Sequence, residues 1–159
     1  DLILASNVFA HSDELKEMAE CMFSLVSKKG TIIIEVQYLM NTLKDLTFDN
    51  IYHEHYNYWS LTSLVYFFKQ FNATIFRSEK IETHGGSIRI YVKKAKKVKI
   101  EKSVKDMLKE EENYGIKDFK TYEDSSLQYL GITTHKFERY GLMDTVITKK
   151  EFKKYFFRY

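Results

Sequence analysis

One short stretch, Ile51–Tyr58, concentrates side chains that could take part in acid–base chemistry. It contains two imidazoles, one carboxylate and three phenols. On an extended backbone alternate side chains point to opposite faces, so the two histidines would share one face, and Tyr52, Glu54 and Tyr56 the other. On a helix the same residues would spread over most of the circumference. In either conformation several titratable groups converge on one segment, which indicates a functional site.

Two other interpretations of this stretch stay open at the level of sequence. The simpler one is a polar loop whose histidines hydrogen-bond the backbone. The other is a metal site in which His53 and His55 bind the ion together with His11 or Glu54. The HxH pattern usually lies in all-β barrels, whereas this chain alternates strands with helices, so we expect no metal ligands here.

The elements that precede the stretch determine where it lies. Residues 1–7 are short and continuously apolar, which predicts a buried strand. Asn7 and His11 follow its carboxyl end, the edge at which open α/β sheets bind ligands. We expect Ser12 to cap a helix that ends at Gly30. The apolar residues of that helix recur at helical spacing and form one face: Leu15, Met18, Ala19, Met22, Phe23 and Val26.

A second strand, Thr31–Val36, is β-branched almost throughout. Its two apolar faces are typical of a parallel strand that helices cover on both sides. A short helical piece with Leu39 and Leu43 follows, and then the stretch Tyr52–Tyr58. This stretch therefore also lies beyond the carboxyl end of a strand, as His11 does. The repeated position favours a pocket over a loop.

The next part of the chain predicts a helix and a pair of strands. Ser60 should cap a helix through Asn72, and two strands should cover residues 73–81 and 87–92. Because their connection, Glu82–Gly86, is short, we expect antiparallel neighbours. Its paired glycines allow positive φ or close approach to a ligand, although an ordinary turn would also use them.

The composition changes after these strands. Five lysines between residues 93 and 99 could bind phosphate, but a solvated linker is favoured because no aromatic or glycine-rich element interrupts them. Ser103 with Asp106 resembles a capping box that opens a helix. Beyond Tyr122 we find no convincing periodicity.

Composition limits the class of protein. The chain has 159 residues, 44% of them hydrophobic, and a formal charge of +3, which suits one domain with a sizeable core and gives no sign of nucleic acid binding. Cys21 stands alone, which excludes an internal disulfide and fits a reducing compartment. No apolar run is long enough for a membrane span and no signal peptide is visible, so we expect a soluble cytoplasmic protein. Composition leaves the oligomeric state open.

Four motifs carry a specific resemblance to a known family. In order and approximate spacing they resemble the nucleotide-sugar C-methyltransferases, over roughly residues 1–115. Those enzymes use S-adenosylmethionine to methylate a carbon next to a ketone on a nucleotide-linked deoxysugar. The motifs are Asn7–His11, Phe48–His55, Tyr58–Thr62 and His84–Arg89.

The resemblance implies an α/β fold: the second half of a Rossmann-like class I methyltransferase domain, with parallel strands and a terminal antiparallel hairpin. Residues 1–94 would form this half domain, residues 95–120 a helical linker, and residues 121–159 the start of a truncated C-terminal domain. The family's cysteine-rich zinc module and the glycine-rich first half of its cofactor domain have no counterpart here. We therefore expect an incomplete chain, with most of the S-adenosylmethionine site upstream and strand 1–7 left as an exposed apolar edge. Lys29 and Gln37 replace prolines that are frequent in the family.

Carbon methylation requires a base that removes a proton next to a carbonyl and donors that stabilise the enolate. A base with a pKa near the working pH favours histidine. On the resemblance, His55 is our hypothesis for the base, and Glu54 would orient it or bind a sugar substituent. Tyr52 and His11 would donate hydrogen bonds to the oxyanion. Sequence alone leaves open which of these residues takes the proton.

The resemblance also supplies binding residues. Asn7 would contact the cofactor, and the glycine-rich connection would cradle the nucleotide diphosphate or the sugar through His84, Gly85, Gly86, Ser87 and Arg89. The alternative of a different class is a truncated, non-catalytic remnant that serves as an interaction module. The start at Asp1, directly in an apolar strand, and the unpatterned tail favour that alternative.

Overall fold

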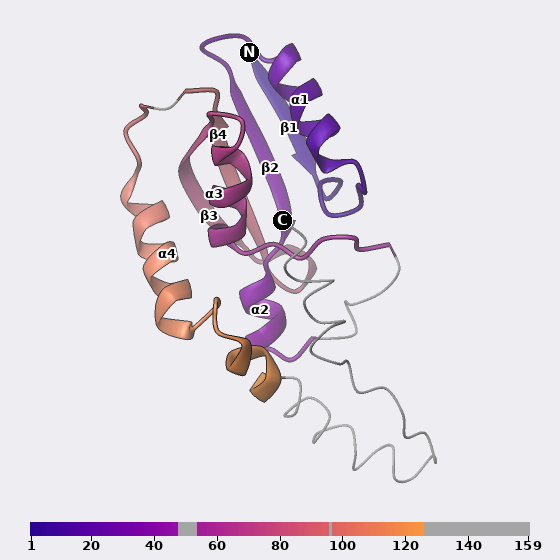
Figure 1. The fold of residues 1–159 in the computed structure, drawn as a ribbon, viewed down its shortest axis with the longest axis vertical. Helices are drawn as coiled ribbons and strands as arrows, with labels where there is room; N and C mark the ends of the chain where they lie inside the picture. The colour runs from indigo at the N-terminus through magenta and orange to yellow at the C-terminus, as the bar shows by residue number, and fades with distance from the viewer. Residues whose placement is uncertain (48–53, 96, 126–159) are drawn as a thin grey trace.

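The computed structural model describes residues 1–47, 54–95 and 97–125 (Figure 1). These residues form a four-stranded sheet with helices on one face and at its ends. A 3-10 turn, Thr83–Gly85, joins the last two strands. The elements follow in the order β1 (Leu2–Ser6), α1 (Leu15–Leu25), β2 (Thr31–Gln37), α2 (Leu39–Lys44), α3 (Leu61–Lys69), β3 (Thr74–Ile81), β4 (Ser87–Lys93) and α4 (Lys102–Tyr114).

The strand order is β1-β2-β4-β3. β1 pairs with β2 in parallel, whereas β4 is antiparallel to both β2 and β3. The parallel pair and the antiparallel hairpin are therefore confirmed. Because β4 alone runs in the opposite direction, the carboxyl ends of β1, β2 and β3 meet at one rim of the sheet. The turn before β4 lies at that rim as well.

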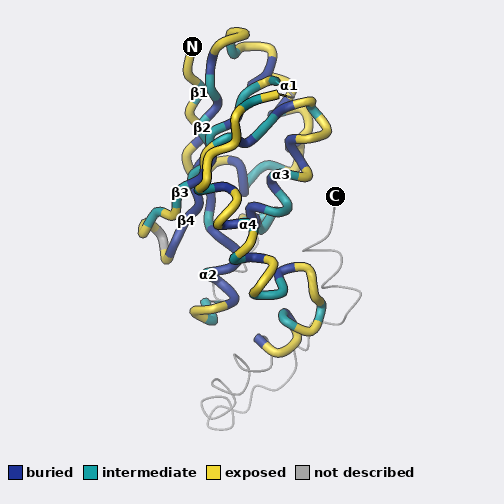
Figure 2. Tube along the Cα trace, turned by 90° about the vertical axis from the view of Figure 1, so that its left-hand side faces the viewer, coloured by how far each residue is buried: buried dark blue, intermediate teal, exposed yellow. Residues whose placement is uncertain are grey.

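One face of the sheet forms the core. Alternate residues of β2 and β4 are fully buried there, and the register places Ile34 opposite Ile90. α1 and α3 cover this face, and Figure 2 shows them together on one side of the strands. Phe9 packs against α3, stacked on Phe68 with ring centroids 5.9 Å apart. The apolar stripe of α1 supplies its buried residues: Leu15, Ala19, Met22 and Phe23.

The opposite face corrects one expectation. Residues 1–7 were predicted to form a buried strand, but Leu2 and Leu4 of β1 are 62% and 65% exposed. β1 is an edge strand, and in the described part of the chain no helix covers the face on which Leu2 and Leu4 lie. The prediction that this strand is an exposed apolar edge is confirmed. The expectation that helices cover the sheet on both faces is not met by the helices that the structure describes.

Three predicted helix starts have different outcomes. Ser60 caps α3 in a reciprocal capping box with Ser63. The predicted cap at Ser12 is wrong, because α1 begins at Leu15, after Glu14. The predicted capping box at Ser103 is wrong as well: α4 begins at Lys102, after Glu101, and the Ser103 hydroxyl accepts a hydrogen bond from the Ser78 N–H of β3 at 3.4 Å.

α4 belongs to the folded body of the molecule. Val104 and Met107 are buried where α4 packs along β3 and against α3. The lysine run before it also makes contacts, with Lys93 5.5 Å from the ring centroid of Phe76. In the ranges described above, none of the helices has the length and apolarity that a membrane crossing requires.

Candidate functional site

The structure brings His11 and His55 together at the carboxyl rim. His11 lies in the loop after β1, and His55 lies in the segment before α3; their ring centroids are 4.8 Å apart. His11 Nδ1 is 2.9 Å from the carbonyl oxygen of Glu54. A carbonyl can only accept, so Nδ1 carries the proton, and Nε2 of a neutral His11 is left as an acceptor. This tautomer follows from the hydrogen bond and decides what His11 can do.

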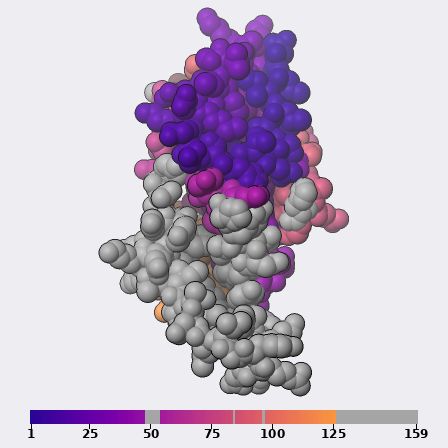
Figure 3. Space-filling model, turned by 90° about the vertical axis from the view of Figure 1, so that its right-hand side faces the viewer, coloured from indigo at the N-terminus to yellow at the C-terminus, as the bar shows by residue number. Residues whose placement is uncertain are grey.

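Backbone hydrogen bonds hold the two histidines in place. The carbonyl of Ala10 accepts from the N–H of Tyr56 at 3.1 Å and from that of Asn57 at 3.3 Å. The Asn57 side-chain amide donates to the carbonyl of Ser12 at 3.0 Å. The loop that carries His11 is thereby joined to the segment that carries His55. Figure 3 shows magenta atoms of the chain after residue 54 bordering the indigo N-terminal part.

The other end of the segment is anchored to β2. Tyr38 forms a parallel bridge with Trp59, and the N–H of Leu39 donates to the Trp59 carbonyl at 2.9 Å. The N–H of Tyr38 also donates to the carbonyl of Gly86 at 3.1 Å. Three parts of the rim therefore meet at Tyr38: the end of β2, the segment 54–60 that carries His55 (the histidine segment), and the turn before β4.

Asn7, predicted to contact the cofactor, lies at the carboxyl rim of the sheet. It follows β1 directly, is half-buried, and has a φ of 55°. Asparagine tolerates this left-handed conformation better than most residues. Its N–H donates to the carbonyl of Glu35 at 2.9 Å, which fixes the turn.

The glycine-rich connection fulfils the conformational part of its prediction. Gly85 and Gly86 have φ of +76° and +104°. A Cβ on Gly86 would lie 2.1 Å from Asn41 Nδ2, so Gly86 also allows α2 to approach. The Ser87 hydroxyl is buried and donates to the Thr83 carbonyl at 3.1 Å, which closes the turn. The side chain of His84 lies outside the described part of the chain.

Arg89 is held by a partner that sequence reasoning missed. Its Nη2 and Nε lie 2.7 and 3.0 Å from Oε2 of Glu35, a carboxylate that is 7% exposed. The hydrogen bond to Glu35 is the main cause that raises the pKa of Arg89 above its ordinary value. Glu35 interrupts an otherwise apolar strand, and a single charge in such a strand is the signal that could have identified it.

A second missed residue is Glu111 of α4, which is fully buried. It follows Val104, Met107 and Leu108 at helical spacing, and this periodicity is the signal that could have placed it on a buried face of α4. Its contacts reach Tyr38, which follows β2, and the first turn of α3, and they are described below.

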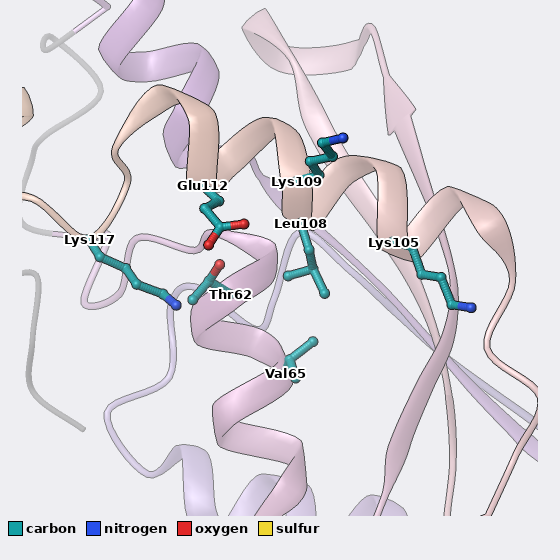
Figure 4. A pocket seen from close by; sticks show the side chains of 7 residues that line it. All are labelled: Thr62, Val65, Lys105, Leu108, Lys109, Glu112 and Lys117. Atoms are coloured by element: carbon teal, nitrogen blue, oxygen red, sulfur yellow. The ribbon is translucent and has the colours of Figure 1, made fainter.

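A groove of about 570 Å³ lies between α3 and α4 (Figure 4). Leu108 points toward Val65 across its apolar part. No described residue predicted for catalysis lines it. The lining residues are Thr62, Val65, Lys105, Leu108, Lys109, Glu112 and Lys117.

Two predicted positions fall outside the described residues. Tyr52, predicted as an oxyanion donor, and His53, the first histidine of the HxH pattern, both lie there. Across the ranges that the structure describes, no group of three or more histidine, cysteine, aspartate or glutamate side chains could hold a metal ion. The HxH metal site therefore stays an untested alternative.

Comparison with known proteins identifies the family of the chain. Residues 82–146 match the model of the C-methyltransferase C-terminal domain. The chain is 32% identical over 124 residues to C-methyltransferase NovU of Streptomyces niveus, a match that covers 77% of this chain. The chain belongs to the C-methyltransferase family. The match spans 30% of the length of NovU, so this C-methyltransferase chain corresponds to less than a third of that relative.

Proposed function

We propose that this chain is part of an S-adenosylmethionine-dependent C-methyltransferase that methylates a carbon next to the ketone of a nucleotide-linked deoxysugar. The observation that carries the proposal is the contact between His11 and His55 at the carboxyl rim, in a chain of the C-methyltransferase family. The sheet supports it: the order β1-β2-β4-β3 suits the second half of a Rossmann-like class I methyltransferase domain. In this proposal residues 95–120 lead toward a further domain that begins near residue 121.

The proposed reaction begins with proton removal from the carbon next to the ketone. His55 is the base in this proposal, and its ring is fixed by its contacts with His11 and Tyr58. The electron pair moves toward the carbonyl oxygen and forms an enolate, whose carbon then bonds to the methyl group. Glu54 would orient His55 or bind a sugar substituent. A bound S-adenosylmethionine would supply that methyl group from its sulfonium, whose sulfur–methyl bond would break as the new carbon–carbon bond forms.

The tautomer of His11 adds a condition to its proposed role. With Nδ1 donating to the Glu54 carbonyl, a neutral His11 has no N–H left for the enolate oxygen. His11 can donate only as an imidazolium, which also places a positive charge beside the developing oxyanion. We therefore propose Tyr52 as a donor to the enolate oxygen, with His11 as a donor only in its imidazolium form.

Substrate binding is proposed for the turn before β4. Gly85 and Gly86 present their backbone at the rim, and Ser87 closes the turn. Arg89 already shares its guanidinium with Glu35, so a diphosphate there would have to compete with a buried carboxylate. Loss of nucleotide-sugar affinity in Arg89→Ala would support the role, and unchanged affinity would remove it.

The proposed cofactor site uses only a small part of this chain. Asn7 is the residue that we expect to contact the cofactor, because it follows the first parallel strand and its backbone is fixed at the rim. The open edge of β1, with Leu2 and Leu4 exposed, fits pairing with a preceding strand that carries the rest of the site.

Calorimetry tests this arrangement directly. We expect S-adenosylmethionine to show no binding to the chain alone and measurable binding to a fusion in which the part of NovU preceding the matched region is joined to Asp1. A fusion that folds but does not bind would contradict the proposal. It would favour the alternative of a non-catalytic interaction module, for which the exposed edge of β1 is the supporting observation.

A further inference from the structure

Two adjacent carboxylates of α4 have opposite surroundings. Glu110 is on the surface, where its oxygens bind Lys80 at 2.6 Å and Lys44 at 3.1 Å. Glu111 is 0% exposed and points into the molecule, toward α3 and the end of β2. A carboxylate is rarely buried in this way unless its hydrogen bonds are satisfied.

The contacts of Glu111 satisfy both of its oxygens. Oε1 accepts from the Tyr38 hydroxyl at 2.9 Å and from the Leu61 N–H at 2.5 Å. Oε2 accepts from the N–H and the hydroxyl of Thr62, at 2.8 and 2.6 Å. The N–H groups belong to the first turn of α3, where the helix dipole favours a negative charge. Burial, and then the negative charge of Glu111, raise the pKa of Tyr38 far above its ordinary range.

These contacts lie at the points where the histidine segment is attached. Leu61 directly follows Ser60, the last residue before α3. Tyr38 is the residue at which β2, Trp59 and the turn before β4 meet. The Glu111 side chain of α4 therefore binds the first turn of α3, which directly follows the segment that carries His55. It also binds Tyr38, to which the same segment is anchored through Trp59.

We propose that Glu111 is a positioning residue that couples α4 to the geometry of the His11–His55 pair. Its effect on catalysis rests on the proposed function, but its effect on the two rings does not. In this proposal Glu111 acts on the two imidazoles indirectly, through the first turn of α3 and through Tyr38.

Nuclear magnetic resonance of the histidine rings tests the proposal on the full chain labelled with ¹⁵N-histidine. Glu111→Gln keeps the size of the side chain but replaces an acceptor by an amide that faces four donors. We expect it to shift the ring ¹⁵N resonances of His11 and His55, assigned by substituting each histidine, by more than the line width. Glu110→Gln is the matched control, because it removes the neighbouring charge but no contact of the rim, and should leave these resonances unchanged.

Tyr38→Phe keeps the experiment decisive if Glu111→Gln does not fold. It removes one of the four hydrogen bonds and should shift the same resonances in the same direction by a smaller amount. A variant, either Glu111→Gln or Tyr38→Phe, that retains the native circular dichroism spectrum and gives wild-type His11 and His55 resonances would overturn the proposal. These resonances do not depend on a methyl donor, so failure of the proposed function would appear separately, as absent cofactor binding by the NovU fusion.

Discussion

Gly86 provides a quantitative test of how the turn before β4 is packed. Gly85 and Gly86 both have positive φ, but a Cβ on Gly85 would meet nothing within 4 Å, whereas one on Gly86 would lie 2.1 Å from Asn41 Nδ2 and 2.8 Å from Asn41 Cγ. We therefore expect Gly85→Ala to cost only the backbone strain, about 1–2 kcal/mol. Gly86→Ala should add an overpacking cost of about 1–3 kcal/mol.

A double-mutant cycle separates these two costs. Asn41→Ala removes the amide that the new methyl group would meet, so Gly86→Ala should cost about 1–3 kcal/mol less in that background. Urea unfolding, followed by the fluorescence of Trp59, the single and buried tryptophan, gives the free energies by linear extrapolation. Equal costs for Gly85→Ala and Gly86→Ala, or no relief from Asn41→Ala, would refute the close approach of α2 to the turn.

Three further predictions test the caps, the charges and the edge. Ser60→Ala should lower the free energy of unfolding by about 1 kcal/mol, whereas Ser12→Ala should have little effect, as measured by urea unfolding; equal effects would contradict the assigned caps. The hydrogen bond with Lys80, and then that with Lys44, lower the pKa of Glu110 below its ordinary value. Because the folded pKa is lowered, its stabilisation should be complete above the usual glutamate range and disappear as the pH falls through the lowered pKa. The free energy of unfolding of the wild type should therefore exceed that of Glu110→Gln at neutral pH by at most about 1 kcal/mol, because solvent screens the ion pair, and the difference should vanish in acid. A difference that grows as the pH falls would contradict this sign. Leu4→Lys should reduce self-association of the isolated chain in light scattering and change the unfolding free energy by less than about 0.5 kcal/mol; unchanged association would show that the β1 edge is not its cause.

The elements were largely predictable because their patterns are local. The β-branched run of β2 and the alternation of β4 identify strands, and Ser60 with Ser63 caps α3 through residues that are neighbours in sequence. The same local patterns predicted caps at Ser12 and Ser103 that the structure does not have. Ser103 instead accepts a hydrogen bond from β3, and that contact depends on how α4 packs.

The candidate site shows the same division. His11 and His55 were placed at one rim because both follow parallel strands, and the structure brings their rings into contact. The partner of Arg89 was not predictable, because Glu35 lies opposite it only in the register that the order β2–β4 imposes. Glu111 was not predicted as a site residue, because its partners are Tyr38, which follows β2, and the first turn of α3, and only the tertiary structure brings them within reach.

Exchange of the substrate's acidic proton tests the proposed chemistry most directly. In heavy water, the NovU fusion with a nucleotide-linked ketodeoxysugar should incorporate deuterium at the carbon next to the ketone, observed by mass spectrometry. His55→Ala should slow this by about 100-fold or more, because general base catalysis typically contributes that much, and Cys21→Ala, an exposed position outside the site, should not. Wild-type exchange in His55→Ala would contradict the assignment of His55 as the base, and absence of exchange in the unsubstituted, folded fusion would contradict the methyltransferase chemistry itself.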